Sequence, residues 1–368
     1  MSGRIIRILG TSVIAEGMAD AKMADAVRVG NAGLLGEVVY MIGDETTIHV
    51  FEETNGLMPG EPVISTGAPR SVELGPGLLG MIYDGIQRPL ETIYAQAGDT
   101  IPQGIQLPAL DRTQRWAFHP AVTVGDKVAA GDIIGTVQET DALSHKIMVP
   151  IGRSGTVQEI HSGERTVEEA VAVIRDSDGR THPLTMLQHW PAGTGRPYCG
   201  RILPSAPLLP DQQGGDAMPP LLKGGTAPIS APSGSGKTAF LQTLAKRADV
   251  DVVIYIACGR RGSEIADFIE AFAPLRNRAI LVASTVDQPG AAQEASIYTG
   301  FTIGEYYRDM GCDVLVLLTE TTNSADPAFP PAFCGRAGAT ICLGSDERQG
   351  SLTVLELSDG QTNREGGA

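Results

Sequence analysis

The sequence lacks any apolar run of about 18 residues, the length that an α-helix needs to cross a bilayer. The first segment, Met1–Gly10, does not form a secretory signal either, because Arg4 and Arg7 interrupt its short apolar run. Basic residues are scarce: the net charge of -15 provides no basic footprint for nucleic-acid phosphates or anionic lipid. We therefore expect a cytoplasmic protein that neither enters a membrane directly nor binds nucleic acid.

Cysteine is also scarce, and its spacing is uninformative for metal binding. None of the five cysteines forms a CxxC pair, and the six histidines are equally scattered. This pattern fits no zinc site and, in a chain of this size, indicates reduced thiols in the cytosol. The cysteines are Cys199, Cys258, Cys312, Cys334 and Cys342.

What the chain does contain is a change of pattern along its 368 residues, which predicts several domains. Residues 1–72 alternate short β-rich runs with glycine turns, which is typical of a small β-barrel. Residues 91–190 form a second β-rich block with repeated Gly-Asp turns, which predicts a small sandwich of hairpins. Residues 200–357 alternate buried strands with helices, which predicts an α/β domain with a mostly parallel sheet. The polar residues 358–368 are expected to be a disordered tail.

Two lysines in the second block suggest an alternative function. Lys127 and Lys146 are candidates for the swinging-arm lysine of a lipoyl or biotinyl domain. The usual Met-Lys hairpin tip is absent, however, so we expect both to be solvated turn lysines.

The third block contains a glycine-rich loop at residues 231–238, Ala-Pro-Ser-Gly-Ser-Gly-Lys-Thr, between an apolar stretch and an amphipathic helix. The segment matches the P-loop pattern G-x-x-x-x-G-K-[ST] except at its first position, where Ala231 adds local strain if that position needs a positive φ. Backbone N–H groups of such a loop converge on phosphates, Lys237 would reach the outer phosphates, and Thr238 would bind Mg²⁺. The alternative is a flexible Gly/Ser turn that happens to precede a lysine. The predicted nucleotide-binding residues are Ser233, Gly234, Ser235, Gly236, Lys237 and Thr238.

Apolar patterning around this loop predicts the elements of the α/β domain. Long apolar runs predict buried strands, and apolar residues at helical spacing predict helices between them. The predicted strands are Asp251–Ala257, Ala279–Ala283 and Asp313–Leu318, and the predicted helices are Thr238–Ala248, Ser263–Phe272 and Ala291–Met310.

Several motifs resemble one family over nearly the whole chain. They are Asp84–Leu90 (DGIQRPL), Gly125–Thr140 (GDKVAAGDIIGTVQET), Glu294–Thr302 (EASIYTGFT) and Glu305–Asp309 (EYYRD). In these segments the sequence resembles the catalytic A subunit of the vacuolar and archaeal-type (V/A-type) rotary ATPases. The resemblance implies ATP hydrolysis or synthesis coupled to H⁺ or Na⁺ transport, ATP/ADP and Mg²⁺ as cofactors, and a peripheral place in a hexameric ring with B-type subunits. It also implies that residues 91–190 are the family's inserted barrel-sandwich domain. The family's C-terminal helical domain has no counterpart here, so we expect a truncated, divergent paralogue.

The resemblance also places altered residues at the positions that carry the family's chemistry. The family's Gly-Glu-Arg is Gly259-Arg260-Arg261 here, so Arg260 stands where a glutamate orients the attacking water. An arginine cannot accept a hydrogen bond from that water. Arg261 matches the family's phosphate-contacting arginine and, with Lys237, is a candidate catalytic residue. The family's arginine before the EAS run is Gln293 here.

The end of the third strand is altered as well. Thr319 stands where the family has the aspartate of the Mg²⁺ shell, and Asn323 where it has an arginine. Glu320 follows by one residue and would point to the opposite face of a strand, so it becomes a candidate metal ligand only if the strand ends early.

Three functions remain open from the sequence. The first is an active ATPase subunit. The second, which we favour, is a nucleotide-binding subunit with impaired catalysis, acting with B-like subunits or with copies of itself. The third is a catalytically dead scaffold or a regulatory or assembly protein acting by protein contacts.

Overall fold

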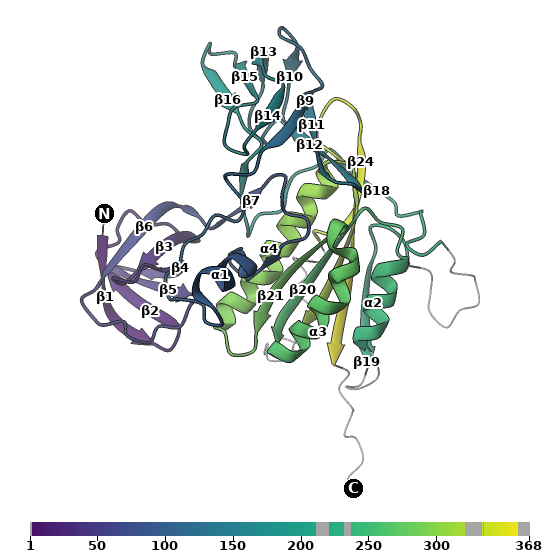
Figure 1. Cartoon of the computed structure of the whole chain (residues 1–368). Helices are drawn as coiled ribbons and strands as arrows, with labels where there is room; N and C mark the ends of the chain where they lie inside the picture. Colours follow the sequence, from purple (N-terminus) through teal and green to yellow (C-terminus); the bar gives the residue numbers. More distant parts are fainter. Residues whose placement is uncertain (1, 211–220, 232–236, 321–332, 334, 360–368) are drawn as a thin grey trace.

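The computed structural model describes residues 2–210, 221–231, 237–320, 333 and 335–359. Within that part of the chain it shows a β-barrel, a β-sandwich that projects away from the rest, and an α/β core (Figure 1). In the same part, no helix combines the length and the apolar character that a membrane span requires.

The barrel is a closed sheet of six strands in the order β1-β2-β5-β4-β3-β6. Side chains alternate between the two faces of each strand, so Thr46, Ile48 and Val50 of β5 all point inward and are buried. Closure leaves no strand edge unpaired. The strands are β1 (Ser2–Leu9), β2 (Ser12–Glu16), β3 (Asp25–Val29), β4 (Leu34–Ile42), β5 (Glu45–Val50) and β6 (Pro62–Pro69).

The sandwich consists of two four-stranded antiparallel sheets, β10-β13-β15-β16 and β12-β11-β9-β14. Its two Gly-Asp turns have the same hydrogen bond. The side chain of Asp126 accepts a hydrogen bond from the N–H of Thr123, and the side chain of Asp132 accepts one from the N–H of Ala129. The strands are β9 (Trp116–Pro120), β10 (Lys127–Val128), β11 (Ile133–Thr140), β12 (Leu143–Met148), β13 (Gly155–Ile160), β14 (Gly163–Arg165), β15 (Ala172–Arg175) and β16 (Thr181–Leu184).

The two lysines of this domain differ in their surroundings. Lys127 is exposed at the start of β10, as expected. Lys146 lies within β12, and its Nζ donates a 2.7 Å hydrogen bond to the carbonyl of Met310 in the core. The prediction of a solvated turn lysine is therefore wrong for Lys146, because the sandwich packs against the end of a core helix.

The core sheet has the strand order β18-β23-β24-β22-β20-β21-β8, and β19 pairs with β24 beyond the end of β23. All of its pairings are parallel except those of β18 and β23. A separate two-stranded sheet joins β7 to β17. The strands are β7 (Ser71–Leu74), β8 (Ile82–Tyr83), β17 (Gln188–Pro191), β18 (Gly200–Ile202), β19 (Thr226–Ala231), β20 (Val252–Arg260), β21 (Ala279–Thr285), β22 (Asp313–Glu320), β23 (Gly338–Ile341) and β24 (Gln349–Asp359).

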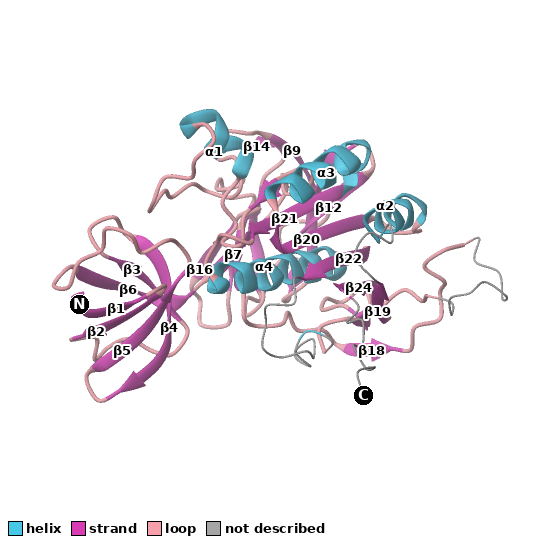
Figure 2. Ribbon diagram, turned by 90° about the horizontal axis from the view of Figure 1, so that it is seen from below, coloured by secondary structure: helices cyan, strands magenta, loops and turns pink. Residues whose placement is uncertain are grey.

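Helices cover both faces of the core sheet (Figure 2). Strand β20 is buried on both sides: Val252, Ile254 and Ile256 pack towards α4, and Val253 and Tyr255 pack towards α2 and α3. Helix α1 lies beside β8 instead. The helices are α1 (Leu90–Ala97), α2 (Lys237–Arg247), α3 (Gly262–Phe272), the 3₁₀ turn η1 (Ala273–Arg278) and α4 (Gly290–Asp309).

Helix α4 lies close to the sheet because two of its residues lack side chains. A Cβ on Gly300 would lie 2.4 Å from Cδ1 of Ile256, and one on Gly304 would lie 2.8 Å from Cδ1 of Leu352. Interiors packed at crystal-like density leave no room for such an atom. These two glycines therefore set how closely the helix approaches β20 and β24.

The predicted fold class is confirmed: an N-terminal barrel, an inserted sandwich and an α/β core with a mostly parallel sheet. The predicted core strands and helices are also present. The exact domain limits remain predictions. The chain between the barrel and the sandwich is not a simple linker: β7 pairs with β17, and β8 is a strand of the core sheet, paired with β21. Most of the predicted tail, from residue 360, lies outside the described residues.

Candidate functional site

The carboxyl ends of the parallel strands meet at one edge of the core sheet. There β19 ends at Ala231, beside Asp359 of β24, and α2 begins at Lys237. The backbone thus follows the order strand, short connection and helix that the phosphate-loop prediction requires. The connection includes Ser233, Gly234, Ser235 and Gly236, which lie outside the described residues; so do the side chains of Lys237 and Thr238.

Strand β20 reaches this edge through an irregularity in its pairing. Its register with β21 shifts between Ala257 and Arg260, and Gly259 between them has a φ of 61°. Glycine adopts this left-handed conformation without strain, and such a bulge changes where the following side chains point. The N–H of Gly259 donates to Oγ of Ser284, 3.3 Å away, and that hydroxyl lies 3.0 Å from Oγ of Ser296. The bulge is therefore supported from both β21 and α4.

The two arginines after the bulge differ in exposure. Arg260 is largely enclosed, with 14% of its side chain exposed, and its Nη1 lies 3.7 Å from Oε2 of Glu264 in the first turn of α3. Arg261 is exposed and precedes α3 as its N-cap residue, without a side-chain capping bond. The carboxylate of Glu264 therefore lies next to the guanidinium of Arg260, whereas the side chain of Arg261 is exposed to solvent.

The end of β22 carries a neutral hydroxyl pair. Thr319 is 2% exposed, and its Oγ1 lies 3.0 Å from the hydroxyl of Tyr255 and 3.3 Å from the carbonyl of Ile256. When the Thr319 hydroxyl donates to the carbonyl of Ile256 and accepts from the hydroxyl of Tyr255, both hydroxyl groups have hydrogen-bond partners. Burial raises the pKa of Tyr255 far above its usual value, so the phenol stays protonated.

The remaining positions singled out by the resemblance are placed as follows. Gln293 donates from Nε2 to the carbonyl of Gln288 at 2.8 Å, and so closes the turn that precedes α4. Glu320 is the last residue of β22, paired with Cys258, so the strand does not end before it; its side chain lies outside the described atoms. Asn323 lies outside the described residues. In the described part of the chain, no group of three histidine, cysteine, aspartate or glutamate residues could hold a metal ion.

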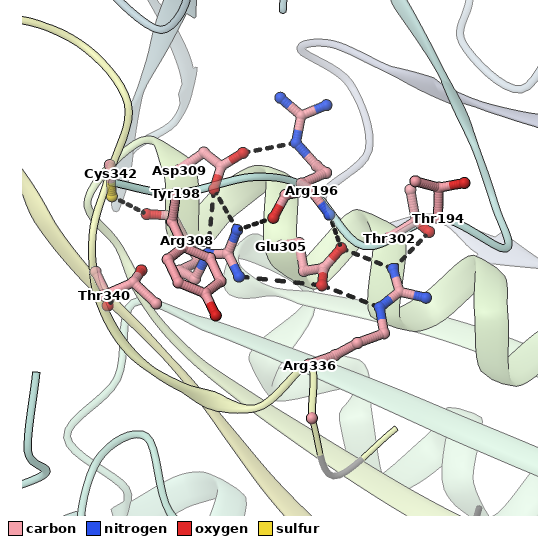
Figure 3. Close-up of polar contacts among 12 residues, drawn as sticks. Thr194, Arg196, Tyr198, Thr302, Glu305, Arg308, Asp309, Arg336, Thr340 and Cys342 are labelled. Atoms are coloured by element: carbon pink, nitrogen blue, oxygen red, sulfur yellow. Dashed lines mark hydrogen bonds and ion pairs between the residues drawn. The ribbon is translucent and has the colours of Figure 1, made fainter. Parts of the chain in front are cut away.

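Sequence reasoning missed a buried ionic network at the far end of α4 (Figure 3). Glu305 accepts hydrogen bonds from Nε and Nη2 of Arg336, at 2.9 and 2.7 Å, and from the backbone N–H of Arg196 at 2.9 Å. Asp309 accepts from Nε of Arg196 and Nη2 of Arg308, each at 2.6 Å. Burial lowers the pKa of Arg308, but the charges of Asp309 and Glu305 outweigh it and raise the pKa overall.

This network lies away from the phosphate-loop edge. Helix α4 follows β21 and precedes β22, so it begins near the carboxyl edge of the sheet and ends near the amino edge. The network joins the segment 194–198 and Arg336 to the helix, which is a structural role. The sequence signals were the motif Glu305–Asp309 and the family-like segments around Arg196 and Arg336, but they did not reveal that these residues are partners.

Three family models match the chain. The model described as "ATP synthase alpha/beta family, beta-barrel domain" matches residues 5–67. The model "ATPsynthase alpha/beta subunit barrel-sandwich domain" matches residues 107–192. The model "ATP synthase alpha/beta family, nucleotide-binding domain" matches residues 215–328, which include the phosphate-loop segment.

Curated relatives agree with these models. The chain is 48% identical over 384 residues to the V-type ATP synthase alpha chain of Acetivibrio thermocellus and 48% identical over 385 residues to that of Clostridioides difficile. It is 48% identical over 387 residues to the A subunit of the A-type ATP synthase of Methanopyrus kandleri. Each match covers 96% of this chain and 65% of the relative, so the chain spans less than two thirds of the relatives' length.

Proposed function

This chain belongs to the ATP synthase alpha/beta family, among the A subunits of V- and A-type ATP synthases, and on that premise we propose that it binds ATP or ADP with Mg²⁺ at the carboxyl edge of its core sheet. The observation that supports this site is the path of the backbone: β19 ends at this edge and α2 starts there with Lys237. The free N–H groups and positive end of a helix at that position favour a phosphate.

In this proposal the loop residues Ser233, Gly234, Ser235 and Gly236 surround the phosphates with backbone N–H groups. Lys237 and Arg261 contribute positive charge, and the Thr238 hydroxyl binds the Mg²⁺ ion. Glu320 is not part of this proposal, because β22 continues to that residue. Bound Mg²⁺ neutralises charge on the phosphates. The exposure of Arg261 is compatible with this role, because its side chain is free to turn towards a ligand.

We further propose that catalysis is impaired. Thr319 occupies the position of the family's Mg²⁺-shell aspartate, and its hydroxyl is engaged by Tyr255 and the carbonyl of Ile256. Arg260 occupies the position of the water-orienting glutamate. Each preorganised catalytic group that is lost typically raises the barrier by about 3–4 kcal/mol. Groups that act as a unit fail together, so little turnover above background is expected.

The partners in this proposal are B-like ATP synthase subunits or further copies of this chain, in a peripheral complex on the cytoplasmic side of a membrane. Coupling to H⁺ or Na⁺ transport would require such a complex. A scaffold or assembly factor without nucleotide binding is the alternative, and it predicts a different result in the following experiment.

Calorimetric titration with ATP and ADP, with and without Mg²⁺, tests the proposal. We expect saturable binding that Lys237→Ala weakens at least tenfold, which corresponds to about 1.4 kcal/mol. The matched control is Lys246→Ala, which removes an exposed lysine from the last turn of the same helix and should leave binding unchanged. Absence of binding at millimolar nucleotide favours the scaffold, and turnover of several per second contradicts impaired catalysis.

A further inference from the structure

Strand β20 contains one extra residue just before it reaches the carboxyl edge of the core sheet. Ala257 pairs with Ala283 on β21, but the next registered pair joins Arg260 to Thr285, so three steps along β20 match two along β21. Side chains alternate between the faces of a strand, so one extra residue moves every later side chain to the opposite face. Gly259, with its φ of 61°, supplies the left-handed residue that such a bulge needs.

The bulge determines which face of the sheet receives Arg260. Before the bulge, Ile254 and Ile256 of β20 pack towards α4, whereas Tyr255 packs towards α2 and α3. A regular strand would therefore direct position 260 towards α4, and the extra residue directs it to the α2–α3 face instead. Two observations agree with this placement. Nη1 of Arg260 lies 3.7 Å from Oε2 of Glu264 on α3, and burial raises the pKa of Tyr255 while the positive charge of Arg260 opposes that rise.

The proposed phosphate site lies on the same face. Helices α2 and α3 contact each other and pack over one hydrophobic cluster, and since both follow parallel strands, both begin at the carboxyl edge (Figure 1). Lys237 starts α2, and Arg260 directly precedes the residue that caps α3. Strands β24 and β22 lie between β19 and β20. A phosphate chain that extends from the start of α2 across these strands brings its terminal phosphate nearest to Arg260.

An additional cation at this place favours the more highly charged of two ligands. ATP has a further phosphate and more negative charge than ADP, and attraction between opposite charges strengthens as they approach. Arg260 is 14% exposed, so water screens its charge less than that of the exposed Arg261. The carboxylate of Glu264 is 43% exposed and lies beyond hydrogen-bond distance, so it does not hold the guanidinium in a bidentate pair.

We propose that Arg260 makes this chain select a nucleoside triphosphate over the diphosphate by binding the terminal phosphate. This inference rests on the nucleotide-binding function proposed above and adds which nucleotide the site prefers. Arginine donates several N–H groups in a fixed plane, which suits a phosphate. The residue at the position of the family's water-orienting glutamate thus serves binding, and the bulge at Gly259 directs it to the phosphate side of the sheet.

Calorimetry with ATP and ADP in the absence of Mg²⁺ tests the proposal, because no metal charge then contributes. For the wild-type chain we expect ATP to bind at least about tenfold more tightly than ADP. Arg260→Gln should weaken ATP binding at least about fivefold and leave ADP binding within about twofold, so that most of the preference disappears. The matched control is Lys246→Gln, which removes a positive charge from the far end of α2 and should retain the wild-type preference.

The outcomes separate this inference from the function on which it rests. If Arg260→Gln does not fold, Arg260→Met, which keeps a long unbranched stem without the charge, replaces it. A wild-type chain that binds neither nucleotide contradicts the proposed function as well as the selectivity. A wild-type chain that binds ATP and ADP equally contradicts the selectivity alone. An unchanged preference in the variant, or an equal loss of affinity for both nucleotides, would also overturn the role of Arg260.

Discussion

The hydroxyl of Tyr255 lies 3.0 Å from Oγ1 of Thr319, and this contact joins strands β20 and β22 near the carboxyl edge of the sheet. Both residues are buried, and Tyr255 also stacks on Phe268 with ring centroids 4.1 Å apart. The pair is uncharged, although Thr319 stands where the family has an aspartate. The interior is thus packed around a hydroxyl, and a carboxylate at the same place would need new partners.

Thr319→Asp should therefore destabilise the chain. A buried carboxylate without a cationic partner costs about 3–5 kcal/mol, whereas Thr319→Val should cost about 1–3 kcal/mol by leaving the Tyr255 hydroxyl unpaired. Urea unfolding of both variants measures the difference in free energy of unfolding. A stable Thr319→Asp variant with stronger Mg²⁺-dependent ATP binding would show that the site already has room for an acidic metal ligand.

Arg260→Glu returns a carboxylate to the position of the water-orienting glutamate. We expect no restored turnover, because Thr319 and Asn323 remain altered, and we expect ATP affinity to fall about tenfold after charge reversal near the proposed phosphate site. A phosphate-release assay and calorimetry measure the two effects. The control is Glu264→Gln, which removes the carboxylate near Arg260 and should leave ATP affinity unchanged or increase it. An increase in turnover of more than about a hundredfold would show that Arg260 alone blocks catalysis.

Glu305→Gln should weaken the core far from the phosphate loop. The substitution removes the charge that Arg336 and Arg308 face in a buried site, and breaking such a pairing costs about 3–5 kcal/mol. Glu270→Gln, an exposed position on α3, should change the free energy of unfolding by less than about 0.5 kcal/mol. Equal stability of the two variants in urea would mean that the network contributes little to folding.

Acid should destabilise the contact between the sandwich and the core through Glu139. Its Oε2 lies 2.6 Å from Nδ1 of His145, whose Nε2 lies 2.9 Å from the hydroxyl of Tyr306 on α4. Burial raises the pKa of Glu139, but His145 and the N–H groups of Leu79 and Gly77 outweigh it, so the pKa lies below its usual value of 4.5.

Because the folded-state pKa is the lower one, this stabilisation is fully present above about pH 5 and is lost as the pH falls through the folded-state pKa. Glu139→Gln should be less stable at pH 7 and should lose less of its remaining stability between pH 5 and pH 3. Urea unfolding across this range measures the change, with the exposed Glu159→Gln as the control. Parallel pH profiles for the wild type and Glu139→Gln would contradict the prediction.

The sequence by itself determined the elements and their class. The run Asp251–Ala257 predicted a strand buried on both faces, and β20 is one, because alternation along a strand is a local property that does not depend on distant residues. The change from short β-rich runs to alternating strands and helices was also visible from the local pattern of apolar residues. The same holds for the strand–loop–helix order around Lys237, since propensity and periodicity act over a few residues.

Only the tertiary structure decided which side chains meet. The pairs Tyr255 with Thr319, Glu139 with His145 and Tyr306, and Lys146 with the carbonyl of Met310 join positions on different elements. A cavity of about 470 Å³ beside Arg70 likewise forms where the barrel, the segment 191–194 and α4 meet. Such contacts depend on how separate elements dock, and a one-dimensional pattern of apolar and polar residues does not specify the docking.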